Sequence, residues 1–423
     1  MLSAPAGKEN HVLQKAGIDV HKKMLAVVVA DVSREGEWQF ERRKFGTMPA
    51  ELDRLHEWLT ALEVKEVVME STAQYWKPVW ARLEREFHLE LAQAQSNRGP
   101  RGRKSDFADA ERLVRRYAAD ELTLSFVPGP EQRLWRRLSR GKQELAGEKV
   151  RLQNRLEALL EEMHIKLSSL VSDLLGVSGR KMLKAVAEGE TDAVKLAALA
   201  DVNLRATPDE LRDAFRAAAT LDGRYRMVLQ QYLDRLALIE RHMEELEKEL
   251  AHSLKEHEGA VTRLAQVPGL GVDSAQQIIA EVGPKAERFP SAGQLSSWVG
   301  TCPGREESAE QSKSNRSPKG NRPMRRILNQ AANAAVKSQG TVFEALYKRI
   351  KGRDPKQHNK AVWAVANHQS RVVWKILHDG VNYEERGNRT NIRAMKHRAR
   401  RLARELRQLG YVVQPPPPQR APA

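Results

Sequence analysis

The first third of the chain is predicted to alternate strands with helices. The segment 16–32 is rich in Val, Ala and Leu, as a buried strand is, and residues 37–45 suit a neighbouring strand. Leu52, Leu55 and Leu59 recur at the spacing of an amphipathic helix. The remaining elements are predicted as strands at 65–72 and 88–94 and helices at 76–86 and 105–119. This order predicts an α/β sandwich with a mixed sheet.

Leucines follow a heptad pattern beyond residue 130. In the first seam Leu138, Leu145, Leu152 and Leu159 are seven residues apart. Leu156 and Met163 occupy the second apolar position of the heptad. The other seam steps by four and three through Tyr225, Leu229, Tyr232, Leu236, Ile239, Met243, Leu246 and Leu250. Such heptads with charged flanks predict a coiled-coil arm, although two long helices of an ordinary bundle fit the same pattern. Residues 168–222, between the seams, are predicted as short helices.

A Gly-rich segment near residue 270 reads as helix, tight turn, helix. Gly269 and Gly271 permit positive φ and the close approach of a phosphate to the backbone. The second helix begins near Asp273, so its first N–H groups face the same side. This is a helix-hairpin-helix signature for sequence-independent backbone contacts, and a plain turn between packed helices is the alternative. Further helices are predicted at 327–337 and 361–378.

These patterns predict a chain of α/β plus all-α class with four parts. They are an α/β domain at 14–125, a helical arm at 126–257, a helical domain at 258–385, and a basic helix with a Pro-rich, disordered tail at 386–423. A chain of 423 residues is long enough for such an organisation.

The charge of the chain predicts a polyanionic partner. The formal net charge is +16 and the pI about 9.9, and nucleic acid is the commonest partner of such a chain. The basic residues concentrate after Glu310, in a stretch that holds no acid up to residue 326: Lys313, Arg316, Lys319, Arg322, Arg325 and Arg326. We expect this loop to contact phosphates, although a solvated basic loop is the simpler interpretation.

An anionic membrane surface is the rival partner, but we find no apolar run long enough to span a bilayer and no signal peptide. Cys302 is the only cysteine, which excludes an internal disulfide, makes a structural zinc site improbable and predicts a reducing, cytoplasmic compartment.

Four carboxylates are candidate metal ligands. Asp19 lies in the first strand and Glu70 ends a later one, while Asp106 and Asp109 share one face of a helix. Four close carboxylates repel one another, and hard divalent cations such as Mg²⁺ compensate that charge. One or two Mg²⁺ ions in such a site would support phosphodiester chemistry. The alternative, for Asp106 above all, is an ordinary helix cap.

The chain resembles the DEDD insertion-sequence transposases, of which the Piv-type DNA invertases are relatives. The resemblance rests on motifs in the family's order over residues 14–385: "GIDVHKK", "VVMESTAQYWKPV", "GRKSDFADAERL", "VPGLG", and "GREESAEQSKSNRSPKGN" followed by "MRRILNQAANAA". It implies an RNase H-like (RuvC-like) N-terminal domain whose Mg²⁺ ligands are Asp19, Glu70, Asp106 and Asp109. It also implies a coiled coil that joins protomers into a dimer or tetramer, and a C-terminal transposase domain.

The family's nucleophilic serine maps to Ser308, which would form a covalent link to DNA. Ala309 and Glu310 follow it where the family usually has Gly, so Ser312, Ser314 and Ser317 are the other candidates. The family also implies a site composed from two protomers. Its members use an element-encoded structured RNA, the bridge RNA, that pairs with target and donor DNA.

The function predicted from the sequence is therefore that of a transposase or site-specific DNA recombinase. Two alternatives stay open: a metal-dependent nuclease of the junction-resolvase type, in which water attacks, and a non-catalytic coiled-coil protein that binds nucleic acid.

Overall fold

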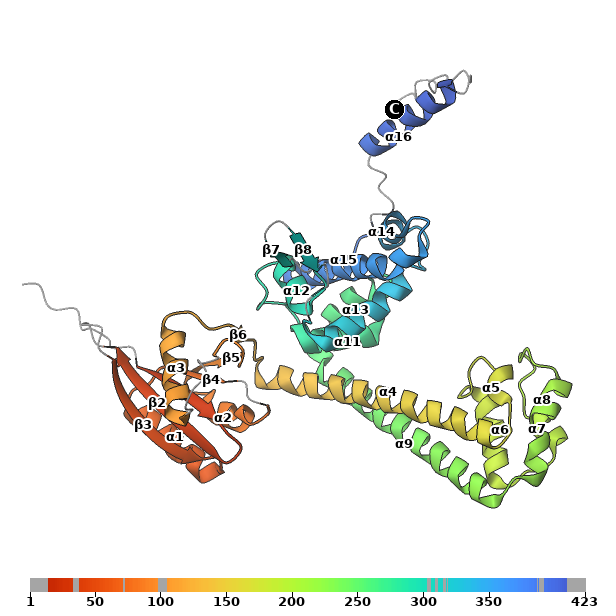
Figure 1. Cartoon of the computed structure of the whole chain (residues 1–423), viewed down its shortest axis with the longest axis horizontal. Coiled ribbons are helices and arrows are strands. Elements are labelled where there is room, and N and C mark those ends of the chain that lie inside the picture. The colour runs from red at the N-terminus through yellow and green to blue at the C-terminus, as the bar shows by residue number, and fades with distance from the viewer. Residues whose placement is uncertain are drawn as a thin grey trace, which may run out of the picture. The chain divides into compact units, whose positions relative to one another are not determined.

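A computed structural model describes residues 14–32, 38–70, 73–97, 105–302, 306–308, 311–314, 317, 319–385, 387 and 392–408. The chain divides into two compact units, Met1–Gly129 and Pro130–Ala423 (Figure 1). Among the described residues, no helix is both long and apolar enough to cross a membrane.

The first unit contains a six-stranded mixed sheet. Its strands are β1 (Lys15–Val20), β2 (Met24–Val32), β3 (Trp38–Gly46), β4 (Glu66–Glu70), β5 (His88–Ala92) and β6 (Leu124–Ser125), in the spatial order β3-β2-β1-β4-β5-β6. β1, β4 and β5 are parallel, whereas β2, β3 and β6 pair antiparallel with their neighbours. This order and direction of strands is that of the RNase H-like fold, as predicted.

One strand prediction was wrong. The segment 16–32 forms two antiparallel strands, β1 and β2, which fold back in a tight turn where the His21 N–H donates to the Met24 carbonyl (3.0 Å). Both strands are buried in the middle of the sheet, so their apolar runs merge in the sequence across the short polar turn His21–Lys23.

Helices cover both faces of the sheet. α1 (Pro49–Ala61) and α2 (Trp76–Leu83) pack on one face, where Ile18, Leu55 and Val79 belong to one buried cluster. α3 (Asp106–Ala118) lies on the opposite face, where Ala110 and Val114 pack with Val28. The first turn of α3 lies at the carboxyl end of β1, since Asp106 is 3.6 Å from His21, the residue that follows this strand.

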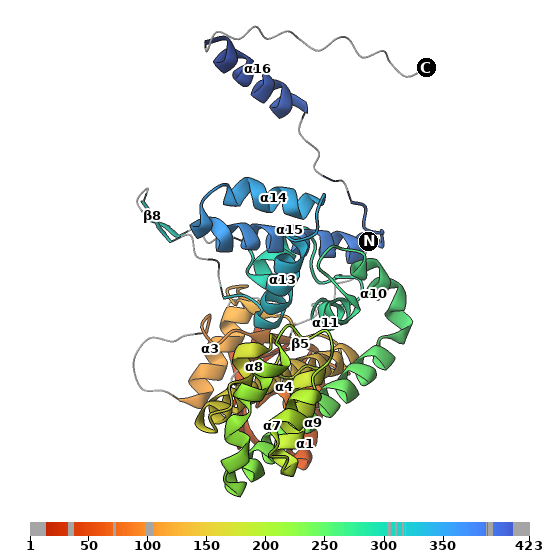
Figure 2. The same ribbon diagram turned by 90° about the vertical axis from the view of Figure 1, so that its right-hand side faces the viewer.

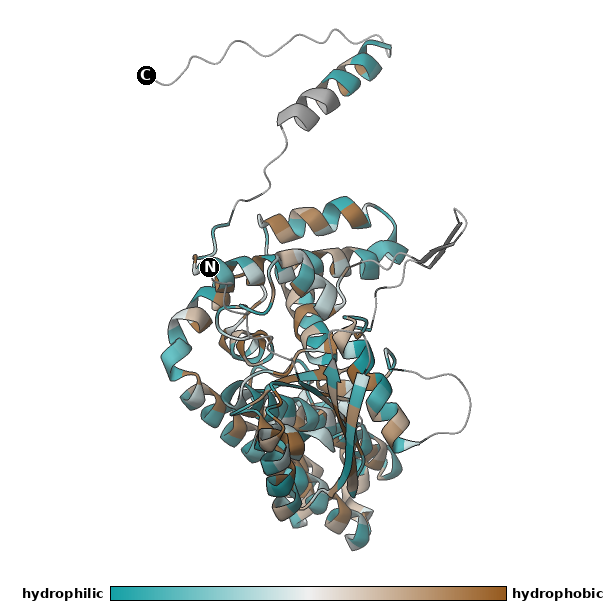
Figure 3. Cartoon of the chain, turned by 90° about the vertical axis from the view of Figure 1, so that its left-hand side faces the viewer, coloured by the Kyte–Doolittle hydropathy of each residue, from teal (hydrophilic) through white to brown (hydrophobic). Residues whose placement is uncertain are grey.

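Two long helices begin the second unit. α4 (Pro130–Glu162) and α9 (Gly223–Ser253) lie side by side (Figure 1). They are antiparallel, because Lys142 pairs with Glu247 and Lys149 with Glu240. Across the chain, Figure 3 shows helices that carry both hydrophobic and hydrophilic residues. Contacts of a coiled coil between protomers stay a prediction.

Short helices connect α4 to α9. They are α5 (Leu167–Leu170), α6 (Val177–Glu188), α7 (Ala193–Ala198), α8 (Pro208–Ala214) and the 3₁₀ turn η1 (Arg216–Thr220). Leu156 of α4, Leu183 of α6 and Leu229 of α9 belong to the same buried cluster. The seam leucines therefore face a shared core at this end of the helices, which their spacing alone did not specify.

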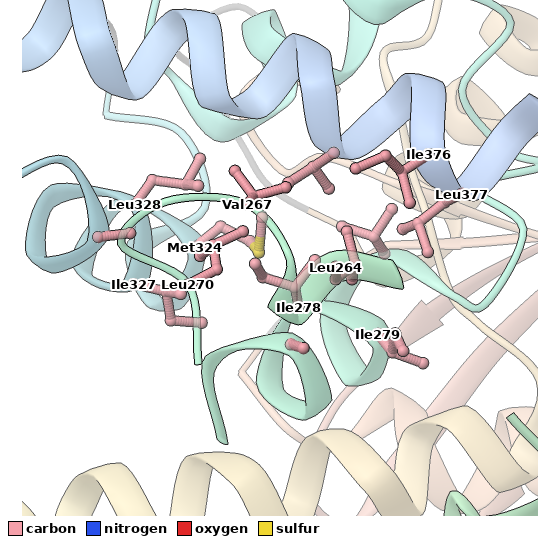
Figure 4. Close-up of a cluster of buried hydrophobic side chains, with 14 of the residues drawn as sticks. Leu264, Val267, Leu270, Ile278, Ile279, Met324, Ile327, Leu328, Ile376 and Leu377 are labelled. Carbon is pink, nitrogen blue, oxygen red and sulfur yellow. The ribbon is translucent and has the colours of Figure 1, made fainter. Parts of the chain in front are cut away.

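The rest of the second unit is a helical body with its own core. Its helices are α10 (Glu258–Ala265), α11 (Val272–Val282), α12 (Ala292–Val299), α13 (Arg322–Ala335), α14 (Val342–Lys351) and α15 (His358–Asp379), with the 3₁₀ turns η2 (Lys255–His257) and η3 (Pro355–Gln357). Figure 4 shows apolar side chains of α10, α11, α13 and α15, such as Leu264, Ile278, Met324 and Ile376, gathered in one cluster.

A small hairpin and a last helix complete the described chain. β7 (Glu306–Ser308) and β8 (Gln311–Ser314) pair antiparallel, and α16 (Ile392–Gln408) follows the helical body. The sequence did not predict the hairpin or the helices α12 and α14. The predicted disordered tail lies outside the described residues.

Candidate functional site

Two of the four predicted acids lie at neighbouring strand ends. Ile18 of β1 is in register with Met69 of β4, and Asp19 and Glu70 are the next residues of these two parallel strands. Because parallel strands end at the same edge of a sheet, the two carboxylates lie beside each other there. The Asp19 side chain is only 13% exposed.

Packing of α3 brings the other two acids to the same edge. Asp106 is the first residue of α3 and Asp109 lies one turn later. The helix crosses β1 closely at Gly17, where an added Cβ would lie 2.5 Å from the Ala110 carbonyl oxygen. Gly17 and Asp19 point to the same face of the sheet, so this close contact fixes the first turn of α3 over Asp19.

The carboxylates around Asp19 affect its titration. The pKa of Asp19 is raised above its ordinary value, first because the carboxyl is buried and then because Glu70, Asp109 and Asp106 repel its charge. Only His21 acts in the opposite direction. The site thus concentrates negative charge that a bound cation would relieve.

Basic and amide side chains surround the acids. His21 Nε2 lies 3.1 Å from Asp19 Oδ2 and 3.6 Å from Asp106 Oδ1, and Lys44 Nζ lies 3.1 Å from Asp106 Oδ2. Asn97 Nδ2 donates to Glu70 Oε2 (3.0 Å). Arg112 donates to Asp109 and to the Asn97 carbonyl.

Sequence reasoning missed these partners of the acids. For His21 a signal existed, since it follows Asp19 by two residues in the quoted motif, and Arg112 lies one turn after Asp109 on the same helix. No local spacing connects Lys44 or Asn97 with the acids that they contact.

The donor set of this site fits a hard divalent cation. Among the described residues, Asp19, His21 and Asp106 each offer a ligand atom, and these atoms all lie within 4.8 Å of one another. Carboxylate oxygens are the preferred ligands of Mg²⁺. Glu70 and Asp109 lie at the same edge but outside this group of three, and their carboxylates accept from Asn97 and Arg112. We therefore regard the four acids as the candidate metal centre.

The predicted nucleophile lies on the hairpin of the second unit. Ser308 ends β7 and is in register with Gln311 of β8. Ser312 and Ser314 are residues of β8 as well, and Ser317 follows that strand. Of these serines only Ser317 has a described side chain, and its Oγ lies 3.2 Å from two nitrogens of Arg325.

Two family models match the chain, one over the region of the four acids and one over the region of the hairpin that carries Ser308. A model of DEDD transposases of the IS110 type, described as "Transposase", matches residues 16–165. A second model, described as "Transposase IS116/IS110/IS902 family", matches residues 261–348. The chain belongs to this transposase family.

A curated relative of this IS110-type chain is the "Insertion element IS110 uncharacterized 43.6 kDa protein" of Streptomyces coelicolor. It is 24% identical over 263 residues, and the match spans 58% of this chain and 62% of the relative. Among solved structures, the chain is similar to two of Thermus thermophilus RuvC, the second of them in complex with a Holliday junction substrate. The sequence identities are 14% and 13% and the TM-scores 0.22 and 0.21, and each match covers 27% of this chain and all of RuvC.

The two family models cover different candidate residues of this IS110-type chain. The first includes Asp19, Glu70, Asp106 and Asp109, and the second includes Ser308 and the basic loop. The two regions therefore carry the two sets of residues on which the predicted chemistry depends.

The predicted phosphate-binding residues have different surroundings. Arg322, Arg325 and Arg326 belong to the start of α13 and not to a loop, so that part of the prediction was wrong. Lys319, Arg322 and Arg326 are exposed, and Arg326 Nη1 donates to the Gln143 carbonyl (3.2 Å). Arg325 is partly buried, donates to the Gly300 carbonyl, and stacks 4.4 Å from the centre of the Trp363 ring. The Lys313 side chain and Arg316 lie outside the described residues.

The two glycines of the predicted helix-hairpin-helix also differ. Gly269 has φ +85°, and an added Cβ would overlap the Ala331 carbonyl of α13, so this glycine lets the turn pack on that helix. Gly271 precedes α11, and an added Cβ there would meet no atom within 4 Å. Gly271 therefore leaves room for the predicted phosphate contact, whereas Gly269 is packed against α13.

Proposed function

We propose that this chain is the transposase of an insertion sequence, a site-specific recombinase that cleaves and exchanges DNA strands through a phosphoserine intermediate. The convergence of Asp19, Glu70, Asp106 and Asp109 at one sheet edge is the observation that carries this proposal. Membership of the IS110-type transposase family supports it, since both family models match this chain.

The four acids have the role of metal ligands in this proposal. When bound, one or two Mg²⁺ ions supply positive charge that polarises a phosphodiester. Asp19 and Glu70 are fixed on adjacent strands, and Asp106 and Asp109 on a helix packed against them, so the ligands are held before substrate arrives. Arg112 and Asn97 orient Asp109 and Glu70.

Ser308 has the role of nucleophile. Its Oγ forms a bond to a DNA phosphorus while the bond from that phosphorus to a deoxyribose oxygen breaks, and the serine proton passes to the leaving oxygen or to solvent. The phosphoserine conserves the energy of the phosphodiester, so a second strand end can reverse the step and complete strand exchange. Cations that follow the hairpin, such as Arg322 at the start of α13, offset the charge that develops on the phosphate.

The partners that we propose are donor and target DNA and an element-encoded bridge RNA, held by a homo-oligomer. The net charge of +16 supports binding to polyanions. Pairing with a guide RNA would supply sequence recognition while the protein contacts phosphates, as the exposed Lys319, Arg322 and Arg326 can.

The serine role is tested by trapping a covalent adduct. The full chain, expressed with its flanking non-coding DNA, is incubated with labelled donor DNA and Mg²⁺ and run on a denaturing gel. We expect an adduct that Ser308→Ala abolishes and that Ser312→Ala, a change in the neighbouring strand, retains. Cleavage without any adduct would instead indicate water as nucleophile, as in a junction-resolvase-like nuclease.

The metal role is tested by thermal melting with and without Mg²⁺. We expect Mg²⁺ to raise the melting temperature of the wild-type chain, because binding to the folded state relieves repulsion among the four acids. Asp19→Asn should reduce this shift and lower strand cleavage by about 10²–10³-fold. Glu57→Gln, a change of an exposed acid on α1, is the matched control. An unchanged Mg²⁺ shift in Asp19→Asn would refute the metal site.

A further inference from the structure

The second unit contains a large cavity, and one of its lining residues closely follows the β7–β8 hairpin, here called the serine hairpin because it carries Ser308. It has a volume of about 1310 Å³ and lies among α13, α14, α15 and the segment after α12. Figure 2 shows α13, α14 and α15 near one another. Ser317, which lines the cavity, comes three residues after β8. The size is ample for one nucleotide, since cavities of about 300–1,000 Å³ hold small ligands.

One face of α15 supplies most of the polar lining. Lys360, Trp363, Asn367 and Arg371 line the cavity at steps of three and four residues, so they form a stripe along the helix. Lys360 and Arg371 are exposed at its two ends, about 16 Å apart by the helical rise, and Trp363 and Asn367 are half-buried between them. Of the described lining residues, none is acidic.

A flat stacking surface lies inside the cavity. The Arg325 guanidinium lies 4.4 Å from the centre of the Trp363 ring. Arg325 is itself held by the Gly300 carbonyl and by Ser317 Oγ (3.2 Å), so this planar pair is fixed in place. Nucleobases stack on tryptophan rings and on guanidinium planes without regard to sequence.

We propose that this cavity binds an unstacked nucleotide of a single strand, its base stacked on the Arg325–Trp363 pair. Asn367 Nδ2 donates to Thr301 Oγ1 (3.5 Å) and Cys302 Sγ (3.7 Å), so its Oδ1 is the atom that accepts from the base edge. Lys360 and Arg371 contact the phosphates on either side. The choice of nucleic acid as ligand rests on the proposed function. A strand held here continues toward the segment that follows β8, so the cavity positions single-stranded nucleic acid relative to the serine hairpin.

The test measures binding of the full chain to fluorescein-labelled ten-residue oligo(dT) and oligo(U). We expect Trp363→Leu to weaken binding by about five- to hundredfold, the range for loss of one stacked base. Trp363→Phe, which keeps an aromatic face, should bind within a few-fold of wild type. Tighter binding of oligo(U) would identify RNA as the natural ligand and tighter binding of oligo(dT) would identify DNA.

Charge variants give a second readout that does not depend on the half-buried Trp363. Lys360→Gln and Arg371→Gln should each reduce the slope of log affinity against log salt by about 0.7, the value for one phosphate contact on a single strand. Lys375→Gln removes the same charge from an exposed position of α15 outside this cavity and should leave the slope unchanged. If Trp363→Leu fails to fold, the salt slopes of Lys360→Gln and Arg371→Gln still test whether the cavity binds a strand. Unchanged slopes in both variants would contradict the proposal.

Photocrosslinking locates the contact. An oligonucleotide with one 4-thiothymidine should crosslink to the tryptic peptide 361–371, which trypsin releases at Lys360 and Arg371. Wild-type affinity in folded Trp363→Leu, or crosslinks confined to other peptides, would overturn the proposal. If the cavity does not bind a nucleotide, the Ser308 adduct should still form. If instead the Ser308 adduct does not form, binding that depends on Trp363 should still be measured.

Discussion

At the residue scale, the acid cluster depends on the missing side chain of Gly17. An added Cβ there would lie 2.5 Å from the Ala110 carbonyl oxygen and 3.0 Å from the Val114 Cβ. Both belong to α3, the helix that carries Asp106 and Asp109. Because backbone atoms cannot rotate away as a flexible side chain can, α3 would have to move from the sheet.

Gly17→Ala should therefore separate the helix acids from Asp19. We expect a loss of about 1–3 kcal/mol in the free energy of unfolding from overpacking, together with a reduced Mg²⁺-dependent shift of the melting temperature. Gly129→Ala, where an added Cβ meets no atom within 4 Å, is the control in the same unit. If Gly17→Ala melts and responds to Mg²⁺ like wild type, the close packing does not set the site.

At the element scale, a buried ion cluster joins α4 to α11 and α13. The fully buried Glu281 side chain accepts from Arg140 Nε (2.7 Å) and Nη2 (2.9 Å) and from Asn321 Nδ2 (3.1 Å). Arg136 Nε lies 3.5 Å away. Burial lowers the pKa of Arg136 to about 10, although the charge of Glu281 opposes this shift.

Removing this carboxylate leaves the largely buried Arg136 guanidinium and the partly exposed Arg140 guanidinium without their counter-charge. We expect Glu281→Ala to lower the free energy of unfolding by about 3–5 kcal/mol, as breaking a buried ion pair does. The measurement is urea denaturation followed by circular dichroism. Glu287→Ala removes an exposed acid near the end of α11 and should change stability by less than about 0.5 kcal/mol. Equal losses in the two variants would contradict the structural role of Glu281.

At the scale of the whole molecule, each unit has its own buried core. In the first unit, strands and helices enclose the clusters that include Ile18, Val28 and Val68. In the second, separate clusters gather around Leu156 and around Ile278. A unit with its own core can fold without the other.

The fragment 1–129 should accordingly fold by itself. We expect a cooperative thermal transition and a Mg²⁺-dependent rise of the melting temperature, because all four acids belong to this unit. The fragment should form no covalent DNA adduct, because Ser308 lies outside it. A fragment that melts without cooperativity would show that the first unit needs the second for its stability.

The sequence by itself determined most elements of the first unit. Helical spacing predicted α1, alternation of residue types predicted β3, and a short apolar run predicted β4, because these signals are local. It did not separate β1 from β2, since both are buried and their apolar runs join. The hairpin β7–β8 was missed because its two short strands carry mostly polar residues, which lack an alternating pattern.

Only the tertiary structure decided what the candidate residues contact. The four acids are up to 90 positions apart in the chain, and strand register together with the packing of α3 on Gly17 brings them to one edge. Lys44, Asn97 and Trp363 acquired their neighbours in the same way. Residue type fixes what chemistry a side chain can perform and local spacing fixes its element, but the distance between remote side chains depends on how the elements pack.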